Sequence, residues 1–84
     1  MRPVTAGFLL YSRPGCGLCE EMLAELQALP AAHGFTIELA DVDAQPEVRQ
    51  RYGQKIPVLL LGGTLVCHGR LDLEKVHKAL AALR

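Results

Sequence analysis

The sequence has no tryptophan, only two tyrosines and two phenylalanines, and no excess of charge of either sign. Nine basic and nine acidic residues cancel to a formal net charge of zero, which gives no electrostatic reason to expect nucleic acid or an anionic membrane as a partner. The apolar runs are short as well. Residues 58–61 are one of the longest, whereas a membrane-spanning helix needs about 20 apolar residues. We therefore expect neither nucleic acid nor a membrane as a partner.

Cysteine is also scarce. Three cysteines cannot all pair within one chain, so the count disfavours a disulfide scaffold. The N-terminal region has a single short apolar block, residues 8–11, and no small-residue cleavage site, so we expect no signal peptide and a cytoplasmic location. Thiols are kept reduced in the cytoplasm, and paired cysteines there are more often catalytic or metal-binding than structural.

What the sequence does contain is a high apolar content. Half of its 84 residues are hydrophobic, which suits a single folded domain over residues 1–84 and argues against disorder. Residues 5–11 and 57–61 are nearly unbroken apolar stretches, which predict strands buried on both faces. Residues 35–39 alternate, as in a half-exposed strand, and residues 64–68 predict the return strand of a hairpin through two glycines.

Three helices are predicted between and after these strands. The first runs from Cys16 or Gly17 to Leu29, and its apolar face consists of Leu18, Met22, Leu26 and Leu29. A second, short helix has Pro46 in its first turn, with Asp43 as the expected N-cap and Gly53 at its end. The last helix is expected to begin after Asp72, and its apolar face includes Leu73, Val76 and Leu80.

The predicted order of elements is therefore βαβαββα. Two crossovers and one hairpin predict a mixed sheet with helices on both faces. With the two apolar strands in the middle and the alternating strand at an edge, the strand order is 2-1-3-4. This α/β arrangement is the thioredoxin fold in its minimal, four-stranded form.

The clearest chemical motif is Cys16-Gly17-Leu18-Cys19, where a central strand gives way to a helix. Residues i and i+3 of a helix are neighbours, with Cβ atoms about 5–6 Å apart, so a small adjustment brings the two sulfurs to bonding distance. Cys16 at the helix N-terminus is favoured as a thiolate by free N–H groups and the helix dipole, and Arg13 adds positive charge. Cys19, one turn inward, is better shielded. These positions favour Cys16 as the attacking thiolate and Cys19 as the resolving thiol.

Residues 11–19, Tyr-Ser-Arg-Pro-Gly-Cys-Gly-Leu-Cys, resemble the active-site segment of glutaredoxins, in which a basic residue precedes the first cysteine by three positions. Residues 55–57, Lys-Ile-Pro, fall where the thioredoxin superfamily carries its cis-proline loop. The glycines at 62–63 match the family's hairpin, and residues 69–76 align with its final glycine turn and helix. The resemblance covers nearly the whole chain and identifies it as a glutaredoxin-like member of the thioredoxin superfamily.

The substrate-binding positions implied by this resemblance are Arg13, Lys55, Ile56, Pro57 and Gly69. Pro57 would be in the cis form, and Ile56 would offer its backbone N–H and C=O to an extended substrate beside the nucleophilic cysteine. Arg13 and Lys55 would meet carboxylates of glutathione or of a partner protein.

The sequence also departs from the family's pattern. Residues 68–72 read His-Gly-Arg-Leu-Asp, without one glycine and the first aspartate of the Gly-Gly-x-Asp-Asp turn that helps glutaredoxins to hold the γ-glutamyl end of glutathione. The dipeptide between the cysteines is Gly-Leu, whereas glutaredoxins usually carry Pro-Tyr and thioredoxins Gly-Pro. Arg49, Arg51 and Lys55 form a small basic cluster that a solvated face explains, although the family often uses this region to meet glutathione.

A metal site is the main alternative use of the cysteines. Cys16, Cys19 and Cys67 with His68 provide four soft or borderline ligands, enough for a tetrahedral zinc ion. Cys67 and His68 are adjacent, however, and neighbours in an extended strand point to opposite faces, so Cys67 is interpreted as a small buried residue. Two further alternatives are a cluster shared between two chains, held by Cys16 and an exogenous thiol, and a non-catalytic adaptor of the same fold.

The sequence therefore predicts a cytoplasmic, glutaredoxin-like thiol–disulfide oxidoreductase with Cys16 as nucleophile and Cys19 as resolving thiol. We expect no built-in cofactor or metal, because electrons would arrive through glutathione as a co-substrate or through a thioredoxin-type reductase. The expected partners are glutathione and protein disulfides. Nothing in the sequence suggests an obligate oligomer, so we expect a monomer.

Overall fold

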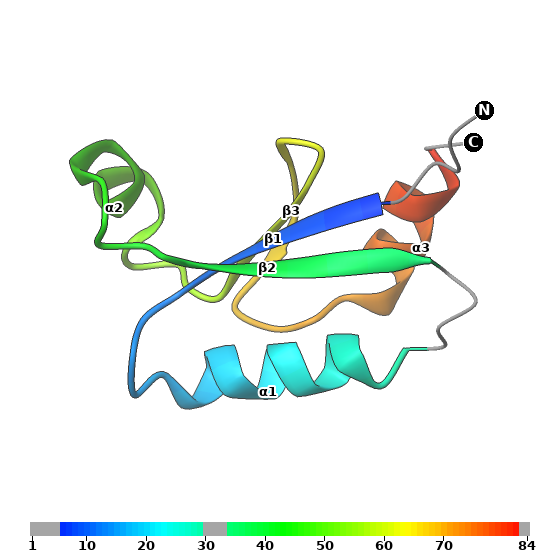
Figure 1. The fold of residues 1–84 in the computed structure, drawn as a ribbon, viewed down its shortest axis with the longest axis horizontal. Helices are drawn as coiled ribbons and strands as arrows, with labels where there is room; N and C mark the ends of the chain where they lie inside the picture. Colours follow the sequence, from blue (N-terminus) through cyan, green and yellow to red (C-terminus); the bar gives the residue numbers. More distant parts are fainter. Residues whose placement is uncertain (1–5, 30–33, 83–84) are drawn as a thin grey trace.

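The computed structural model describes residues 6–29 and 34–82. These form a sheet of four strands and three helices (Figure 1), in the order that the sequence predicts: β1 (Ala6–Ser12), α1 (Gly17–Gln27), β2 (Phe35–Asp41), α2 (Pro46–Tyr52), β3 (Val58–Leu61), β4 (Thr64–His68) and α3 (Leu73–Ala81). Within the described ranges, no helix is long and apolar enough to cross a bilayer.

The strand order is β2-β1-β3-β4, as predicted for this α/β fold. Strand β1 is parallel to β2 and antiparallel to β3, and β4 returns antiparallel to β3 after the glycine pair at 62–63. All four residues of β3 are buried, whereas every second residue of β2 is exposed over most of its length, as expected for a central and an edge strand. Because β1 and β2 are parallel, their C-terminal ends lie at the same end of the sheet, and the loops that follow both strands begin there.

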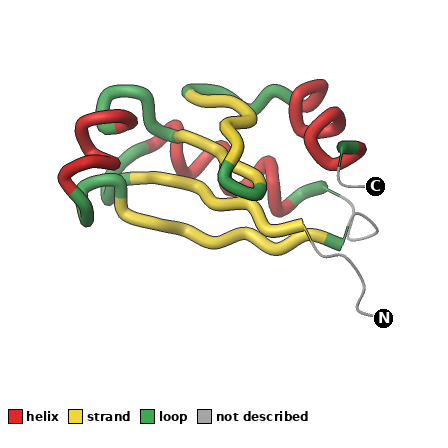
Figure 2. The backbone as a smooth tube through the Cα atoms, turned by 90° about the horizontal axis from the view of Figure 1, so that it is seen from above, coloured by secondary structure: helices red, strands yellow, loops and turns green. Residues whose placement is uncertain are grey.

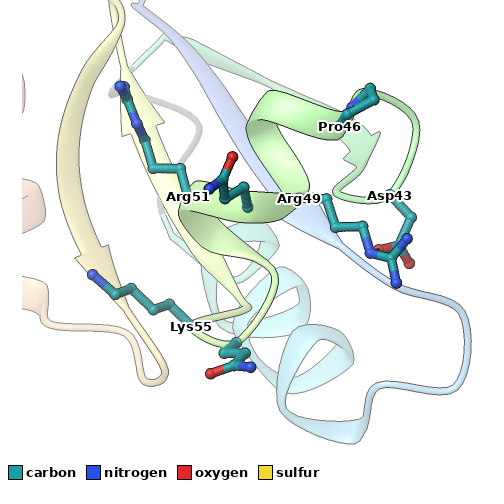
Figure 3. A pocket seen from close by; sticks show the side chains of 7 residues that line it. Asp43, Pro46, Arg49, Arg51 and Lys55 are labelled. Carbon is teal, nitrogen blue, oxygen red and sulfur yellow. The ribbon is translucent and has the colours of Figure 1, made fainter.

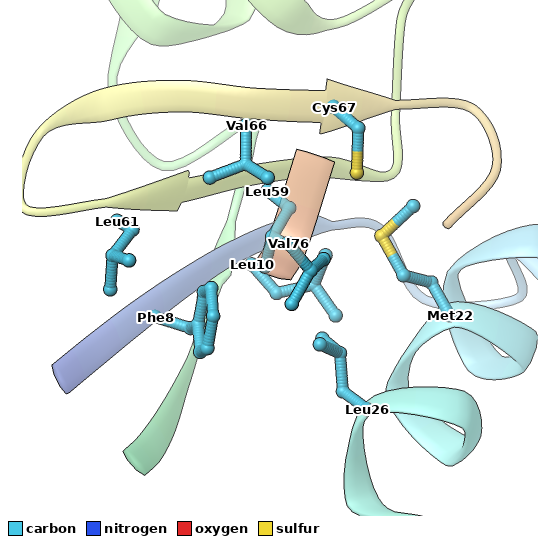
Figure 4. Close-up of a cluster of buried hydrophobic side chains, with 9 residues drawn as sticks. All are labelled: Phe8, Leu10, Met22, Leu26, Leu59, Leu61, Val66, Cys67 and Val76. Carbon is cyan, nitrogen blue, oxygen red and sulfur yellow. The ribbon is translucent and has the colours of Figure 1, made fainter. Parts of the chain in front are cut away.

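The core lies between the sheet and two helices, α1 and α3 (Figure 4). Alternate residues of β1 and β3 face these helices, because successive side chains of a strand point to opposite faces. Each fully buried aliphatic side chain contributes about 1.5–3 kcal/mol. The buried members of this core are Phe8, Leu10, Met22, Leu26, Leu59, Leu61, Val66, Cys67 and Val76.

Helix α2 lies at one end of the sheet and α3 toward the other (Figure 2). No residue of α2 is buried, and its last residue, Tyr52, stacks on Tyr11 of β1 with ring centroids 5.8 Å apart. Tyr11 neighbours the core residue Leu10 and therefore points to the opposite face of the sheet. Helices thus contact both faces, as predicted.

Three details of the sequence-based prediction are wrong, and one of them is Leu73, which was predicted on the apolar face of the last helix but is 49% exposed. Leu18, predicted on the same apolar helix face as Met22, is 44% exposed, because the first turn of α1 lies beside the turn at residues 69–71 instead of under the sheet. Asp43 is not the N-cap of α2. Gln45 holds that position without a side-chain hydrogen bond, and the Asp43 carboxylate is bound by an arginine instead. Arg13 offers the carboxylate two N–H donors of a charged group, at 2.7 and 2.9 Å, whereas an N-cap position offers it neutral backbone N–H groups.

Candidate functional site

A disulfide between Cys16 and Cys19 begins α1, with the two Cα atoms 5.2 Å apart. Cys16 is the N-cap residue, with extended backbone angles, and its Sγ accepts a hydrogen bond from the Cys19 N–H at 3.2 Å. Its own N–H donates to the carbonyl oxygen of Arg13 at 3.1 Å, which closes the turn before the helix. The predicted pairing and the predicted position of the pair on the fold are both present.

The two sulfurs differ in their surroundings. Cys19 is 4% exposed and lies one turn into the helix, whereas Cys16 is half-buried at the end where N–H groups point outward. Once the disulfide is reduced, the N–H of Cys19 and the positive end of the helix stabilise negative charge on the Cys16 sulfur. An incoming group therefore reaches Cys16 first, and Cys19 stays behind it.

The loop before β3 is held against the turn before α3. The Ile56–Pro57 peptide bond is cis, which confirms the prediction, and Pro57 is fully buried. Gly69 donates its backbone N–H to the carbonyl oxygen of Pro57 at 2.8 Å and has a φ of +78°, a conformation that glycine adopts without strain. Three of the predicted substrate-binding residues, Ile56, Pro57 and Gly69, are thus brought together.

Two hollows flank the first turns of α1. One, of about 130 Å³, separates α1 from the turn before α3 and is lined by Leu18, Met22, Gly69, Arg70, Leu71 and two glutamates of α1. The other, of about 280 Å³, borders the disulfide itself and is lined by the 12–16 loop, Cys19, Glu20, Leu23, Leu39 and Asp41. Leu18 and Leu39 leave apolar surface beside these hollows, since they are 44% and 53% exposed. Both sides of the cysteine helix therefore present a hollow bordered by an exposed leucine.

Arg13, predicted as a substrate contact, is bound within the protein. Its Nε and Nη2 donate to the two oxygens of Asp43 at 2.7 and 2.9 Å, and Arg49 Nε lies 3.5 Å from one of the same oxygens. The hydrogen bond from Arg13 lowers the pKa of Asp43 and raises that of the guanidinium. One carboxylate is thus shared by two arginines.

Sequence reasoning missed Asp43 as the partner of Arg13, although a signal for it exists. Arg13 follows β1 directly, and Asp43 follows β2 after one further residue. Because parallel strands end at the same edge of a sheet, charged residues just after two paired parallel strands are expected to meet there.

Lys55 lies in a separate hollow of about 550 Å³ along α2 (Figure 3), which is lined by Asp43, Pro46, Arg49, Gln50, Arg51, Gln54 and Lys55. Arg49 is directed toward Asp43, while the side chains of Arg51 and Lys55 extend away from it. The basic cluster predicted from the sequence is therefore an exposed surface, and Lys55 does not line either of the hollows beside α1.

The structure does not bring together the four zinc ligands considered in the sequence, which are Cys16, Cys19, Cys67 and His68. Cys67 is 5% exposed in the core and points toward Met22 (Figure 4), whereas the neighbouring His68 is exposed. Burial raises the pKa of the Cys67 thiol, which keeps it protonated. Among the described residues, no three histidine, cysteine or acidic side chains are placed to hold a metal ion.

Comparison with known proteins supports the relationship that the motif and the fold indicate. Residues 8–81 match the family described as Glutaredoxin-like domain (DUF836). The uncharacterized protein Rv0508 of Mycobacterium tuberculosis is 29% identical over 77 residues, which cover 86% of this chain and 79% of that protein. The solution structure of protein Ne2328 from Nitrosomonas europaea is 29% identical, with a TM-score of 0.83 over 93% of this chain and 94% of its own. A buckwheat glutaredoxin–glutathione complex has the same fold at 17% identity, with a TM-score of 0.57 over 90% of this chain and 73% of its own. The chain has the thioredoxin fold and belongs to the family described as Glutaredoxin-like domain (DUF836).

Proposed function

We propose that this protein is a dithiol–disulfide oxidoreductase of the cytoplasm in which Cys16 attacks substrate and Cys19 resolves the intermediate. The observation that carries the proposal is the asymmetric cysteine pair at the start of α1, with the half-buried Cys16 as N-cap and the buried Cys19 one turn inward. Membership of a glutaredoxin-like family fits a redox role for this pair.

The reaction consists of two exchanges. In the first, the Cys16 thiolate attacks one sulfur of a substrate disulfide, the substrate S–S bond breaks, and the other substrate sulfur leaves as a thiolate that takes up a proton. In the second, Cys19 loses its proton and attacks the Cys16 sulfur, which releases the remaining substrate thiol and forms the Cys16–Cys19 disulfide. The substrate gains two electrons and two protons: the protein supplies both electrons and the Cys19 proton, and solvent supplies the second proton. Two molecules of glutathione, or a thioredoxin-type reductase, then return the protein to the dithiol.

Substrate binding is proposed at the loop before β3. Ile56 would pair its backbone with an extended segment of the substrate, in the manner of a short added strand. Two observations support this: the bond between Gly69 and Pro57 fixes the loop, and the hollow beside Leu18 opens next to the same glycine. Lys55 is proposed to contact carboxylates further along the substrate, from the α2 side.

The test is reduction of a peptide disulfide by the purified protein in a glutathione redox buffer, together with its intact mass. We expect oxidation to remove about 2 Da, mapped by digestion to Cys16–Cys19. Cys16→Ser should abolish turnover, Cys19→Ser should accumulate the mixed disulfide on Cys16, and Cys67→Ala should retain turnover. Turnover by Cys16→Ser, or a native mass that carries iron–sulfur or zinc on a pair that resists oxidation, would overturn the proposal.

A further inference from the structure

Arg13 lies three residues before Cys16 and lines the same hollow, yet its charge is paired with a carboxylate of the protein at the surface, where the two side chains are 40% and 34% exposed. The guanidinium donates two parallel hydrogen bonds to Asp43, at 2.7 and 2.9 Å, which is the bidentate geometry in which arginine binds a carboxylate most strongly. A substrate carboxylate approaching Arg13 would meet a group whose charge is already balanced by Asp43 and whose Nε–Nη2 edge is already in use.

The loop after β2 holds the Asp43 carboxylate in this position. Val42 is fully buried, and its N–H donates to the carbonyl oxygen of Ser12 at 3.0 Å. The N–H of Asp43 donates to the side chain of Asp41 at 2.8 Å, which fixes the turn. These contacts preorganise the loop, so little conformational entropy is lost when Asp43 binds Arg13.

The guanidinium is also confined from α2. A Cβ atom on Gly53 would lie 3.5 Å from Arg13 Nη2, which places the end of α2 beside the guanidinium. Arg49 adds a second cation to the Asp43 carboxylate at 3.5 Å. Arg13 is therefore part of an intramolecular cluster that joins the cysteine loop to α2.

We propose that Asp43 is a specificity-determining residue. By occupying Arg13, it removes the attraction of that guanidinium for a carboxylate beside Cys16, so that the site discriminates less between anionic disulfides, such as glutathione mixed disulfides, and neutral ones. This inference rests on the proposed oxidoreductase function. It also replaces the sequence-based expectation that Arg13 itself meets the substrate carboxylate.

The test compares two substrates that differ by one charge: a glutathionylated peptide, and the same peptide carrying the glutathione glycine ethyl ester. The quantity measured is the ratio of kcat/KM for the acid to kcat/KM for the ester. We expect this ratio to be about three- to tenfold higher for Asp43→Asn, which frees the guanidinium, than for the wild type. The matched control is Glu47→Gln in the first turn of α2, which removes the same charge without touching Arg13 and should leave the ratio unchanged. In the double variant Asp43→Asn, Arg13→Met, the gain should disappear.

An equilibrium measurement separates this inference from the proposed function. S-methylglutathione and its glycine ethyl ester are titrated into the oxidised wild type and the oxidised Asp43→Asn variant, and their dissociation constants are compared by NMR. If Asp43→Asn tightens binding of the acid relative to the ester, the inference stands even where turnover is absent and the enzyme assignment fails. If neither the kinetic ratio nor the binding ratio changes, Asp43 does not set specificity and the inference is wrong, whatever the turnover of the wild type.

Discussion

Gly69 donates its backbone N–H to the carbonyl oxygen of Pro57 at 2.8 Å, so the turn before α3 and the loop before β3 form one unit beside the cysteine helix. The two residues are 12 positions apart in the sequence, at opposite ends of the β3–β4 hairpin. Because the hairpin carries both, its pairing with β1 determines where this unit lies relative to Cys16.

The first prediction concerns Gly69 itself. Its φ of +78° is costly for any residue with a side chain, while nothing within 4 Å would obstruct a Cβ atom. Gly69→Ala should therefore lower the free energy of unfolding by about 1–2 kcal/mol through backbone strain alone, and should raise KM for a disulfide substrate by displacing the turn. Urea unfolding and steady-state kinetics measure the two effects.

Gly17→Ala is the matched control for stability. Gly17 is the first residue of α1, also has open space where a Cβ would be, and does not have a positive φ. The same substitution should leave stability unchanged or raise it by about 0.4–1 kcal/mol. Equal losses at both positions would show that the backbone conformation of Gly69 is not the cause.

The second prediction concerns Leu18, the exposed side chain between the two cysteines. Leu18 is 44% exposed, so Leu18→Ala should change the free energy of unfolding by less than about 1 kcal/mol. Because Leu18 lines the hollow next to Gly69, the same substitution should raise KM for a peptide disulfide. Leu26 lies on the same helix and is fully buried, so Leu26→Ala should cost about 2–5 kcal/mol and leave KM of the folded protein unchanged. A raised KM for Leu26→Ala without one for Leu18→Ala would contradict the assignment of Leu18 to substrate contact and Leu26 to stability.

The topology could be predicted because the pattern of apolar residues in each strand indicates whether one face or both faces of that strand are buried. Residues 58–61 are all apolar and are all buried in β3, and the alternation of residues 35–39 corresponds to the edge strand β2. Once central and edge strands are distinguished, few connections remain for an order of βαβαββα. The position of the cysteine pair followed, since the pair occupies the junction of β1 and α1.

Side-chain partners across the sheet edge could not be predicted in the same way. Helical spacing placed Leu18 in the core, because periodicity along α1 does not reveal where the sheet ends above it. Local chemistry favoured Asp43 as an N-cap, but the choice between a backbone N–H and a guanidinium 30 residues away depends on tertiary contacts. Leu18 lies between the two cysteines, and Asp43 is bound to Arg13 in the loop that precedes them.

The third prediction concerns Cys67, which is buried in the core beside Met22. Since burial raises the pKa of its thiol, little thiolate forms, and iodoacetamide should label no cysteine of the oxidised native protein but one in denaturant. Cys67→Ser should lower the free energy of unfolding by about 1–3 kcal/mol, because a hydroxyl would be buried in apolar surroundings, and Cys67→Ala should cost less. Rapid labelling of the native protein at Cys67 would show that it is accessible and open the possibility of a third redox thiol.

The fourth prediction follows from the lowered pKa of Asp43, whose main cause is the hydrogen bond from Arg13. A carboxyl whose pKa is lower in the folded state stabilises the fold above its unfolded pKa, about 3.9 for aspartate, and this stabilisation is lost as the pH falls through the folded value. The wild type should therefore be more stable than Asp43→Asn in urea at pH 7, and the difference should shrink progressively as the pH is lowered below about 4.

Glu47→Gln serves as the control, because no ion pair among the described residues involves Glu47. Its difference in stability from the wild type should stay small both at pH 7 and below about pH 4. A difference at Asp43 that is constant from pH 7 to pH 3 would mean that the ionised carboxylate does not hold Arg13 in solution, and the specificity role assigned to Asp43 would lose its physical basis.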